Sequence, residues 1–207
     1  MTGMTNLHMA RLALHIVIIL AVAGIGRPAA AVDASPDRPG AWFDCGEPGV
    51  TGSRCASRDG NGRMLLQRSY RARLRYDRHG LAVVRLEDPS GSGRGGWFYA
   101  RRDGSMAEVM TFDNGPDAFV NGRARAPVGT KIGYVDRALK RVISAKYDGA
   151  YPFENGIAVV CIGCSLVSKG EHSWFEGGTW GCIDPDGKTV APFKARERPV
   201  FADMCRP

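Results

Sequence analysis

The feature that most constrains the fold of this chain is a short segment that recurs along it. The clearest copy, KIGYVDRALKRVISAKYDGAYPFENGIAVV at residues 131–160, contains three short apolar runs separated by turn residues. These runs, at 132–136, 141–144 and 157–161, predict three strands. A unit of this size cannot bury its own apolar face, so neighbouring copies must pack into one continuous core.

Three other segments repeat the same order of residues. One begins at Trp97, with Phe119 in the place of Phe153, and another begins at Trp180 and is incomplete. A degraded copy, LLQRSYRARLRYDRHGLAVV at 65–84, belongs to a unit that begins near residue 53. The sequence therefore predicts an all-β fold of about four tandem antiparallel three-strand units, starting near 53, 97, 132 and 180, with roughly ten to twelve strands. The units would form one β body, and propeller-, barrel- and solenoid-like arrangements all remain open.

These residues resemble the WG repeat, also called the KWG repeat, of bacterial proteins. The third unit keeps Gly133, Tyr134, Asp136, Tyr147, Asp148, Phe153, Gly156 and Ala158, and the fourth keeps Trp180, Gly181, Ile183, Asp184, Gly187 and Lys188. The chain departs from the pattern at Ile132, Phe98 and Arg101, and the first unit lacks the Trp-Gly pair. The resemblance implies a repeat-built interaction module without a defined activity. The aromatic positions Trp97, Tyr147, Phe153 and Trp180 are expected to be core residues.

The N-terminal residues 1–31 have the features of a signal peptide. Arg11 precedes an apolar run over 12–25, and small residues at 29–31 fit a cleavage site. The run is shorter than the roughly 20 residues that span a bilayer. We expect an exported chain, periplasmic or secreted and not stably inserted in a membrane, with a lead-in at 32–52 and the β domain at 53–207.

All six cysteines follow the predicted cleavage site, and an oxidising compartment would convert them into three disulfides. Aligning CASRDG with CIDPDG puts Cys55 and Cys182 at one repeat position. That alignment favours Cys45–Cys55, Cys164–Cys182 and Cys161–Cys205. Zinc binding is disfavoured because a second CxxC is missing, and redox catalysis because the CxxC follows a strand. No metal or cofactor is predicted.

The charge of the chain is +7, and removing residues 1–31 lowers it to about +5. Nucleic-acid binding is not expected from this mild excess. Arg71, Arg73 and Arg75 alternate with Ala72, Leu74 and Tyr76, which predicts a strand with arginines along one face. Leu66, Tyr70 and Leu74 also fit helical spacing. The arginines would protect a sheet edge or be solvated; alternatively, Arg68, Arg71, Arg73, Arg75 and Arg78 would bind an anionic polymer.

No catalytic residue is predicted, because the sequence lacks the GxSxG, HExxH and glycine-rich phosphate-loop motifs. A carboxylate pair from Asp136, Asp148 and Asp184 could hydrolyse a carbohydrate, but repeat turns explain these positions. The insertion at 165–178 is the expected binding loop, through Lys169, His172, Trp174 and Phe175. The sequence therefore predicts a non-enzymatic module that binds an envelope protein or polysaccharide. The alternatives are an envelope carbohydrate hydrolase and an arginine-mediated binder of an anionic polymer.

Overall fold

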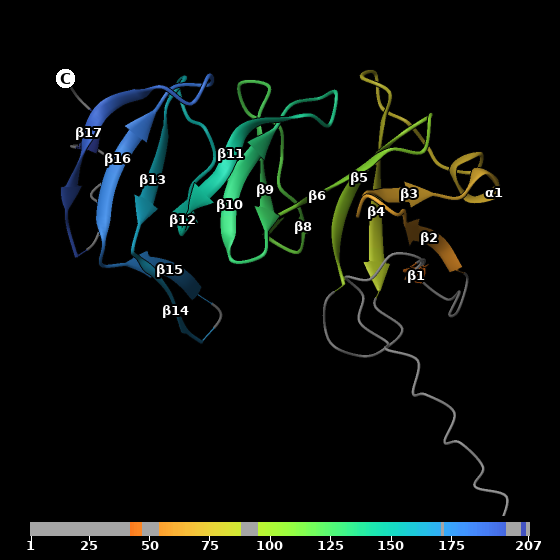
Figure 1. The fold of residues 1–207 in the computed structure, drawn as a ribbon, viewed down its shortest axis with the longest axis horizontal. Coiled ribbons are helices and arrows are strands. Elements are labelled where there is room, and N and C mark those ends of the chain that lie inside the picture. The colour runs from red at the N-terminus through yellow and green to blue at the C-terminus, as the bar shows by residue number, and fades with distance from the viewer. Residues whose placement is uncertain (1–41, 47–53, 88–94, 171, 198–203, 206–207) are drawn as a thin grey trace, which may run out of the picture. The chain divides into compact units, whose positions relative to one another are not determined.

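The computed structural model describes residues 42–46, 54–87, 95–170, 172–197 and 204–205, all within one compact unit, residues 34–207. The predicted signal peptide lies outside these residues. The described part contains seventeen strands and one short helix (Figure 1), so the all-β prediction is confirmed. The strands outnumber the predicted ten to twelve because three of them span two residues each and one hairpin was expected to be a loop.

The first sheet runs in the order β3-β2-β1-β4-β5-β6. Its strands are β1 (Trp42–Cys45), β2 (Arg54–Arg58), β3 (Met64–Leu66), β4 (Leu81–Glu87), β5 (Gly96–Arg101) and β6 (Met106–Val109). A bridge joins Leu65 of β3 to Ser105, just before β6, and the Leu66 N–H donates to the Gly104 carbonyl at 2.9 Å. The two outer strands therefore meet, and the sheet is a nearly closed barrel.

The remaining strands form two further main sheets and two small ribbons. The second main sheet has the order β11 (Arg141–Tyr147), β10 (Lys131–Val135), β9 (Ala124–Val128). The third has the order β12 (Gly149–Ala150), β13 (Ala158–Ile162), β16 (Thr179–Ile183), β17 (Thr189–Ala195). The ribbons pair β7 (Thr111–Phe112) with β8 (Gly115–Pro116) and β14 (Ser165–Lys169) with β15 (His172–Glu176).

One rule relates these sheets to the sequence units. The third strand of a unit pairs with the first strand of the next unit, as in β4–β5, β9–β10 and β13–β16. Each main sheet thus combines strands from two units, and no unit completes a sheet alone. Strand β1, which belongs to the predicted lead-in, takes the place of a preceding unit's third strand, because it pairs with β2, the first strand of the first unit.

The same turn joins the first and second strands at four places. Its first residue donates its N–H to the carbonyl four residues later, always at 2.9 Å. The four donor–acceptor pairs are Asp59–Arg63, Arg101–Ser105, Asp136–Lys140 and Asp184–Lys188. The fourth residue of each turn, Gly62, Gly104, Leu139 or Gly187, has a positive φ. When the turns are aligned, Asp59 corresponds to Asp184. Cys55 then corresponds to Trp180 and not to Cys182.

The second and third units also share side-chain contacts. The Tyr99 hydroxyl donates to the Asp117 carbonyl at 3.2 Å, and the Tyr134 hydroxyl donates to the Tyr151 carbonyl at 2.8 Å. Tyr99 and Tyr134 contact Phe119 and Phe153 with ring centroids 4.8 and 4.9 Å apart. Asn121-Gly122 and Asn155-Gly156 form tight turns with positive φ at both residues. These contacts relate two units in detail, while the count of four units stays a prediction.

All six cysteines form disulfides: Cys45–Cys55, Cys161–Cys164 and Cys182–Cys205. The predicted Cys45–Cys55 pair is confirmed, and the predicted Cys164–Cys182 and Cys161–Cys205 pairs are wrong. The prediction failed because it aligned Cys55 with Cys182. In the structure the chain turns directly after β13, which brings the Cα atoms of Cys161 and Cys164 to 6.0 Å.

The predicted strand with alternating arginines is also wrong. Residues 68–71 form helix α1 (Arg68–Arg71). Leu66 and Tyr70 are buried in the core of the first sheet, and Leu74 packs against it. Of these three apolar residues only Tyr70 lies in α1, because Leu66 ends β3 and Leu74 lies beyond the helix. The arginines do not line a sheet edge.

Of the four aromatic residues expected in the core, three are buried and one is half-buried. Tyr147, Phe153 and Trp180 belong to the largest buried cluster, which lies between the second and third main sheets. Trp97 packs against a smaller cluster that includes Val109 and Val135.

Candidate functional site

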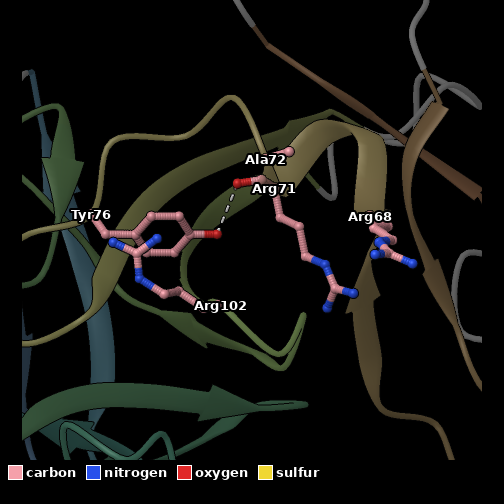
Figure 2. A pocket seen from close by; sticks show the side chains of 5 residues that line it. All are labelled: Arg68, Arg71, Ala72, Tyr76 and Arg102. Atoms are coloured by element: carbon pink, nitrogen blue, oxygen red, sulfur yellow. Dashed lines mark hydrogen bonds between the residues drawn. The ribbon is translucent and has the colours of Figure 1, made fainter.

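One candidate site is an open surface pocket of about 260 Å³ beside helix α1. It is lined by Arg68, Arg71, Ala72, Tyr76 and Arg102 (Figure 2). We call it the arginine pocket. Three of its five lining residues carry a permanent positive charge, so its chemistry is that of an anion site.

Helix α1 places two of the arginines. The Gln67 N–H donates to the Cys55 carbonyl at 2.7 Å, which fixes the start of the helix against β2. Buried Tyr70 anchors the helix in the core of the first sheet. Arg68 and Arg71 are three residues apart and therefore lie on the same side of the helix. The anchored backbone thus directs both side chains to one cavity.

The segment after the helix and the β5–β6 turn complete the wall. The Tyr76 hydroxyl donates to the Arg71 carbonyl at 3.1 Å, which holds the chain beyond the helix in place. The Arg102 guanidinium carbon lies 4.3 Å from the centroid of the Tyr76 ring. Figure 2 shows this guanidinium over the ring. Such a contact contributes about 0.5–1 kcal/mol at an exposed site and restrains the arginine.

Gly104 permits the close approach of the β5–β6 turn to the pocket. Its φ is +95°, and a Cβ at this position would lie 2.6 Å from Nη1 of Arg71. The same Cβ would lie 3.1 Å from the carbonyl oxygen of Leu66. The backbone conformation and the close Leu66 carbonyl therefore favour glycine here, and a side chain at this position would displace the flexible end of Arg71.

The equivalent positions in other units show which features of this site belong to the repeat and which are particular to the first unit. Arg137 follows Asp136 as Arg102 follows Arg101, and its guanidinium carbon lies 4.9 Å from the Phe119 ring centroid. The contact of this arginine with an aromatic ring therefore recurs between units and is part of the architecture. The two helix arginines do not recur. In the sequence alignment Arg71 takes the position of Asp113 and Asp148, so the first unit reverses the charge there.

The surroundings leave the pocket arginines largely uncompensated. Within the described residues, neither α1 arginine nor Arg102 forms an ion pair with a carboxylate. Asp103 lies near Arg71, but its carboxylate accepts the hydroxyl and N–H of Ser105 at 2.6 and 2.9 Å. The pKa of Asp103 is lowered first by these hydrogen bonds and then by Arg101 and Arg71. The field at the pocket is positive and favours an anionic ligand.

The structure places only two of the five arginines proposed for polymer binding in the pocket. Arg73 lies over the Tyr70 ring at 5.2 Å, and Arg78 Nε contacts His79 Nε2 at 3.1 Å. Arg75 is exposed and does not line the cavity. Sequence reasoning missed Arg102 because it belongs to another unit and meets α1 only in the folded barrel.

The three aspartates considered for hydrolysis all make contacts within the repeat framework. Asp136 Oδ1 accepts the Lys140 N–H, and Asp184 Oδ1 accepts the Lys188 N–H, both at 2.9 Å. Asp148 pairs with Lys131 at 2.5 Å and accepts the Gly163 N–H at 2.7 Å. These contacts lower the pKa of Asp148, with the Lys131 hydrogen bond as the largest cause. The structure shows a turn or strand-end role for each carboxylate.

The expected binding loop is an ordered hairpin, β14–β15. Lys169 and His172 pair near its tip, and both are exposed. The Trp174 indole N–H donates to Glu176 at 2.6 Å. Phe175 is buried and meets the Tyr151 ring edge-on at 5.9 Å. The hairpin is therefore anchored in the core by Phe175, which is not part of an exposed binding face.

Sequence reasoning also missed a buried ion pair in the second unit. Arg125 Nη2 lies 2.6 Å from Asp117 Oδ1, and Arg125 Nη1 donates to the Ala150 carbonyl at 3.1 Å. Asp117 and Arg125 are 1% and 6% exposed, so the pair lies in the interior and links the second unit to the third. The third unit has Tyr151 and Val159 at the aligned positions, so the repeat pattern does not predict this pair.

The described ranges contain no group of three His, Cys, Asp or Glu side chains arranged to hold a metal ion. No helix within them has both the length and the apolar character needed to cross a bilayer.

The fold and the recurring contacts define a class of protein, built from antiparallel β units that share their sheets with their neighbours. Residues 132–163 and 180–194 match the family model described as WG containing repeat. The chain therefore carries WG repeats in these two segments. No curated protein and no solved structure shows a significant match to it.

Proposed function

We propose that this chain is an exported, non-enzymatic WG-repeat module that binds an anionic macromolecule of the cell envelope. The observation that carries the proposal is the arginine pocket. Three arginines line it, and two of them, Arg68 and Arg71, lie where the first unit departs from the repeat. A purely structural repeat does not need this departure, because the second and third units have Asp113 and Asp148 at the position of Arg71.

Export is supported by the cysteines and by the N-terminal residues. All six cysteines form disulfides, which persist in oxidising compartments such as the periplasm or the extracellular space. The predicted signal peptide at residues 1–31 leads to the same compartments. The ligand is therefore expected among the anionic polymers, glycans and lipids of the envelope.

The experiment uses the chain from residue 32, produced with its disulfides, and measures binding to polyphosphate, polygalacturonate and neutral dextran. The triple variant Arg68→Gln, Arg71→Gln, Arg102→Gln is compared with Arg73→Gln, Arg75→Gln, Arg78→Gln. Both variants lose the same charge, but only the first changes the pocket. We expect the first to weaken binding to at least one polyanion by about tenfold or more, since arginine–anion hydrogen bonds are charge-assisted.

The control triple variant is expected to lose less than about threefold, because exposed charges contribute mainly through a screened, nonspecific field. Dextran should not bind. Equal losses in the two variants would show that net charge and not the pocket causes binding. Absence of binding to every polyanion at low salt would reject the proposed function.

A further inference from the structure

We infer that the arginine pocket recognises a phosphate monoester, the terminal phosphate of a glycan, polymer or lipid. This inference rests on the proposed function, because it specifies the anionic group that the pocket binds. It follows from the number of guanidinium groups, from the three backbone positions that carry them and from the charge around the cavity.

The placement of the guanidinium groups favours a ligand with several terminal oxygens. A carboxylate has two oxygens in one plane, and a single arginine fork satisfies both. Here Arg68 and Arg71 come from the two ends of α1, and Arg102 comes from the β5–β6 turn. All three line one cavity (Figure 2). A tetrahedral phosphate monoester offers three terminal oxygens, so that arginines carried by separate backbone positions can each reach a different one.

The charge of the pocket favours the same group. Three guanidinium groups stay protonated at all physiological pH values. A phosphate monoester carries about −1.5 to −2 charges at pH 7, whereas a carboxylate, a phosphodiester or a sulfate ester carries −1. The carboxylate of Asp103, which interacts electrostatically with Arg71, is already hydrogen-bonded to Ser105. The pocket therefore gains most from the ligand with the highest charge in one group.

The tyrosine does not extend recognition beyond the phosphate. Arg102 covers a face of the Tyr76 ring, and the Tyr76 hydroxyl donates to the Arg71 carbonyl. In the pocket the hydrogen-bond donors of the side chains are thus guanidinium N–H groups. The phosphate itself is recognised, and a sugar phosphate and a lipid phosphate present the same chemistry.

The test compares three ligands on one sugar scaffold: glucose 6-phosphate, glucose 6-sulfate and glucuronate. Binding to the processed protein is measured by NMR titration or calorimetry at low salt. We expect the phosphate to bind at least about fivefold tighter than either other ligand at pH 8. Its affinity should fall between pH 8 and pH 5 as the phosphate gains its second proton, near pH 6.

The sulfate should show little change over this pH range. The ionisable side chains that line the pocket are Arg68, Arg71, Arg102 and Tyr76, and Asp103 interacts with Arg71; none of these residues is a histidine. A matching pH profile for sulfate would show that the protein and not the ligand titrates, and it would overturn the inference. Arg71→Gln should abolish the preference for phosphate, whereas Arg75→Gln should leave it unchanged.

Vesicles distinguish the two sources of the phosphate. Phosphatidic acid carries a phosphate monoester, and phosphatidylglycerol carries a phosphodiester. Preferential binding to phosphatidic acid supports the inference with a lipid as the source, and preferential binding to glucose 6-phosphate supports it with a soluble glycan. Pocket-dependent binding that is equal for glucuronate or stronger would overturn the inference and leave the proposed function intact. If no anion depends on the pocket, both fail.

Discussion

At the scale of single residues, the second and third units place different chemistry at the same position. Asp117 and Arg125 form a buried ion pair where the third unit has Tyr151 and Val159. Two buried charges are tolerated only when they are paired and hydrogen-bonded, and here Asp117 also accepts the Arg125 N–H at 2.7 Å. Loss of either partner would therefore leave an unpaired charge buried in the second unit.

We expect Asp117→Asn to lower the free energy of unfolding by about 3–5 kcal/mol, because it leaves the Arg125 guanidinium buried without a counter-charge. Urea denaturation of the oxidised protein measures this loss. The matched control is Asp148→Asn, the same chemical change at a pair whose side chains are 42% and 22% exposed. Its expected cost is about 1 kcal/mol at most. Similar costs for the two variants would contradict the role assigned to burial.

The Lys131–Asp148 pair makes a separate prediction about pH. The pKa of Asp148 is lowered in the folded state, first by the Lys131 hydrogen bond and then by the Gly163 N–H. Folding therefore favours the ionised carboxylate. The contribution to stability is present above the unfolded pKa of about 4 and is lost as the pH falls through the lowered folded value.

The parent protein should therefore be more stable than Asp148→Asn at pH 6, and this difference in the free energy of unfolding should shrink as the pH falls to 2. Lys131→Met should act in the same direction, since it removes the largest cause of the shift. Thermal unfolding at several pH values measures both variants. A difference that stays constant over this range would show that Asp148 ionisation does not contribute to stability.

At the scale of elements, the turn between the first and second strands offers a matched test of the pocket. Gly62 and Gly104 occupy the same position of this turn, with φ of +78° and +95°. An added Cβ meets nothing within 4 Å at Gly62, whereas at Gly104 it meets Arg71 and the Leu66 carbonyl. The two glycines differ in their contacts and not in their backbone requirement.

We expect Gly62→Ala to cost about 1–2 kcal/mol from backbone strain alone, with unchanged anion binding. Gly104→Ala should cost more and weaken binding in the pocket, because Arg71 must move. Denaturation and ligand titration on the same samples separate the two effects. Equal stability losses, together with intact binding in both variants, would show that the β5–β6 turn does not position Arg71.

The elements also show which parts of the fold can be read from the sequence. The unit at 131–160 was predicted well because its glycines, aromatic residues and turns all specify the same strands. Helix α1 stayed an open alternative to a strand because Leu66, Tyr70 and Leu74 fit helical spacing and the arginines fit the period of a strand, and only burial in the barrel decides between the two. The pocket could not be predicted, since Arg102 reaches α1 through closure of the first sheet, which local patterns do not encode.

At the scale of the whole molecule, shared sheets make the units dependent on one another. The third unit places its third strand, β13, against β16 of the fourth. After β17, the tail returns to the third main sheet, where Cys205 is bonded to Cys182 of β16. This disulfide closes 23 residues, whereas Cys161–Cys164 closes only 3. The two bridges should therefore stabilise the molecule to different extents.

In the chain-entropy model, a disulfide stabilises by restricting the unfolded chain, and its effect grows with loop length. We expect Cys182→Ala with Cys205→Ala to lower the free energy of unfolding by about 3 kcal/mol, and Cys161→Ala with Cys164→Ala by about half as much. Urea denaturation of each double variant, with the other disulfides intact, measures the two losses. A larger loss for the Cys161–Cys164 variant would contradict the chain-entropy model. It would show that this bridge stabilises the folded state by holding the end of β13 in place.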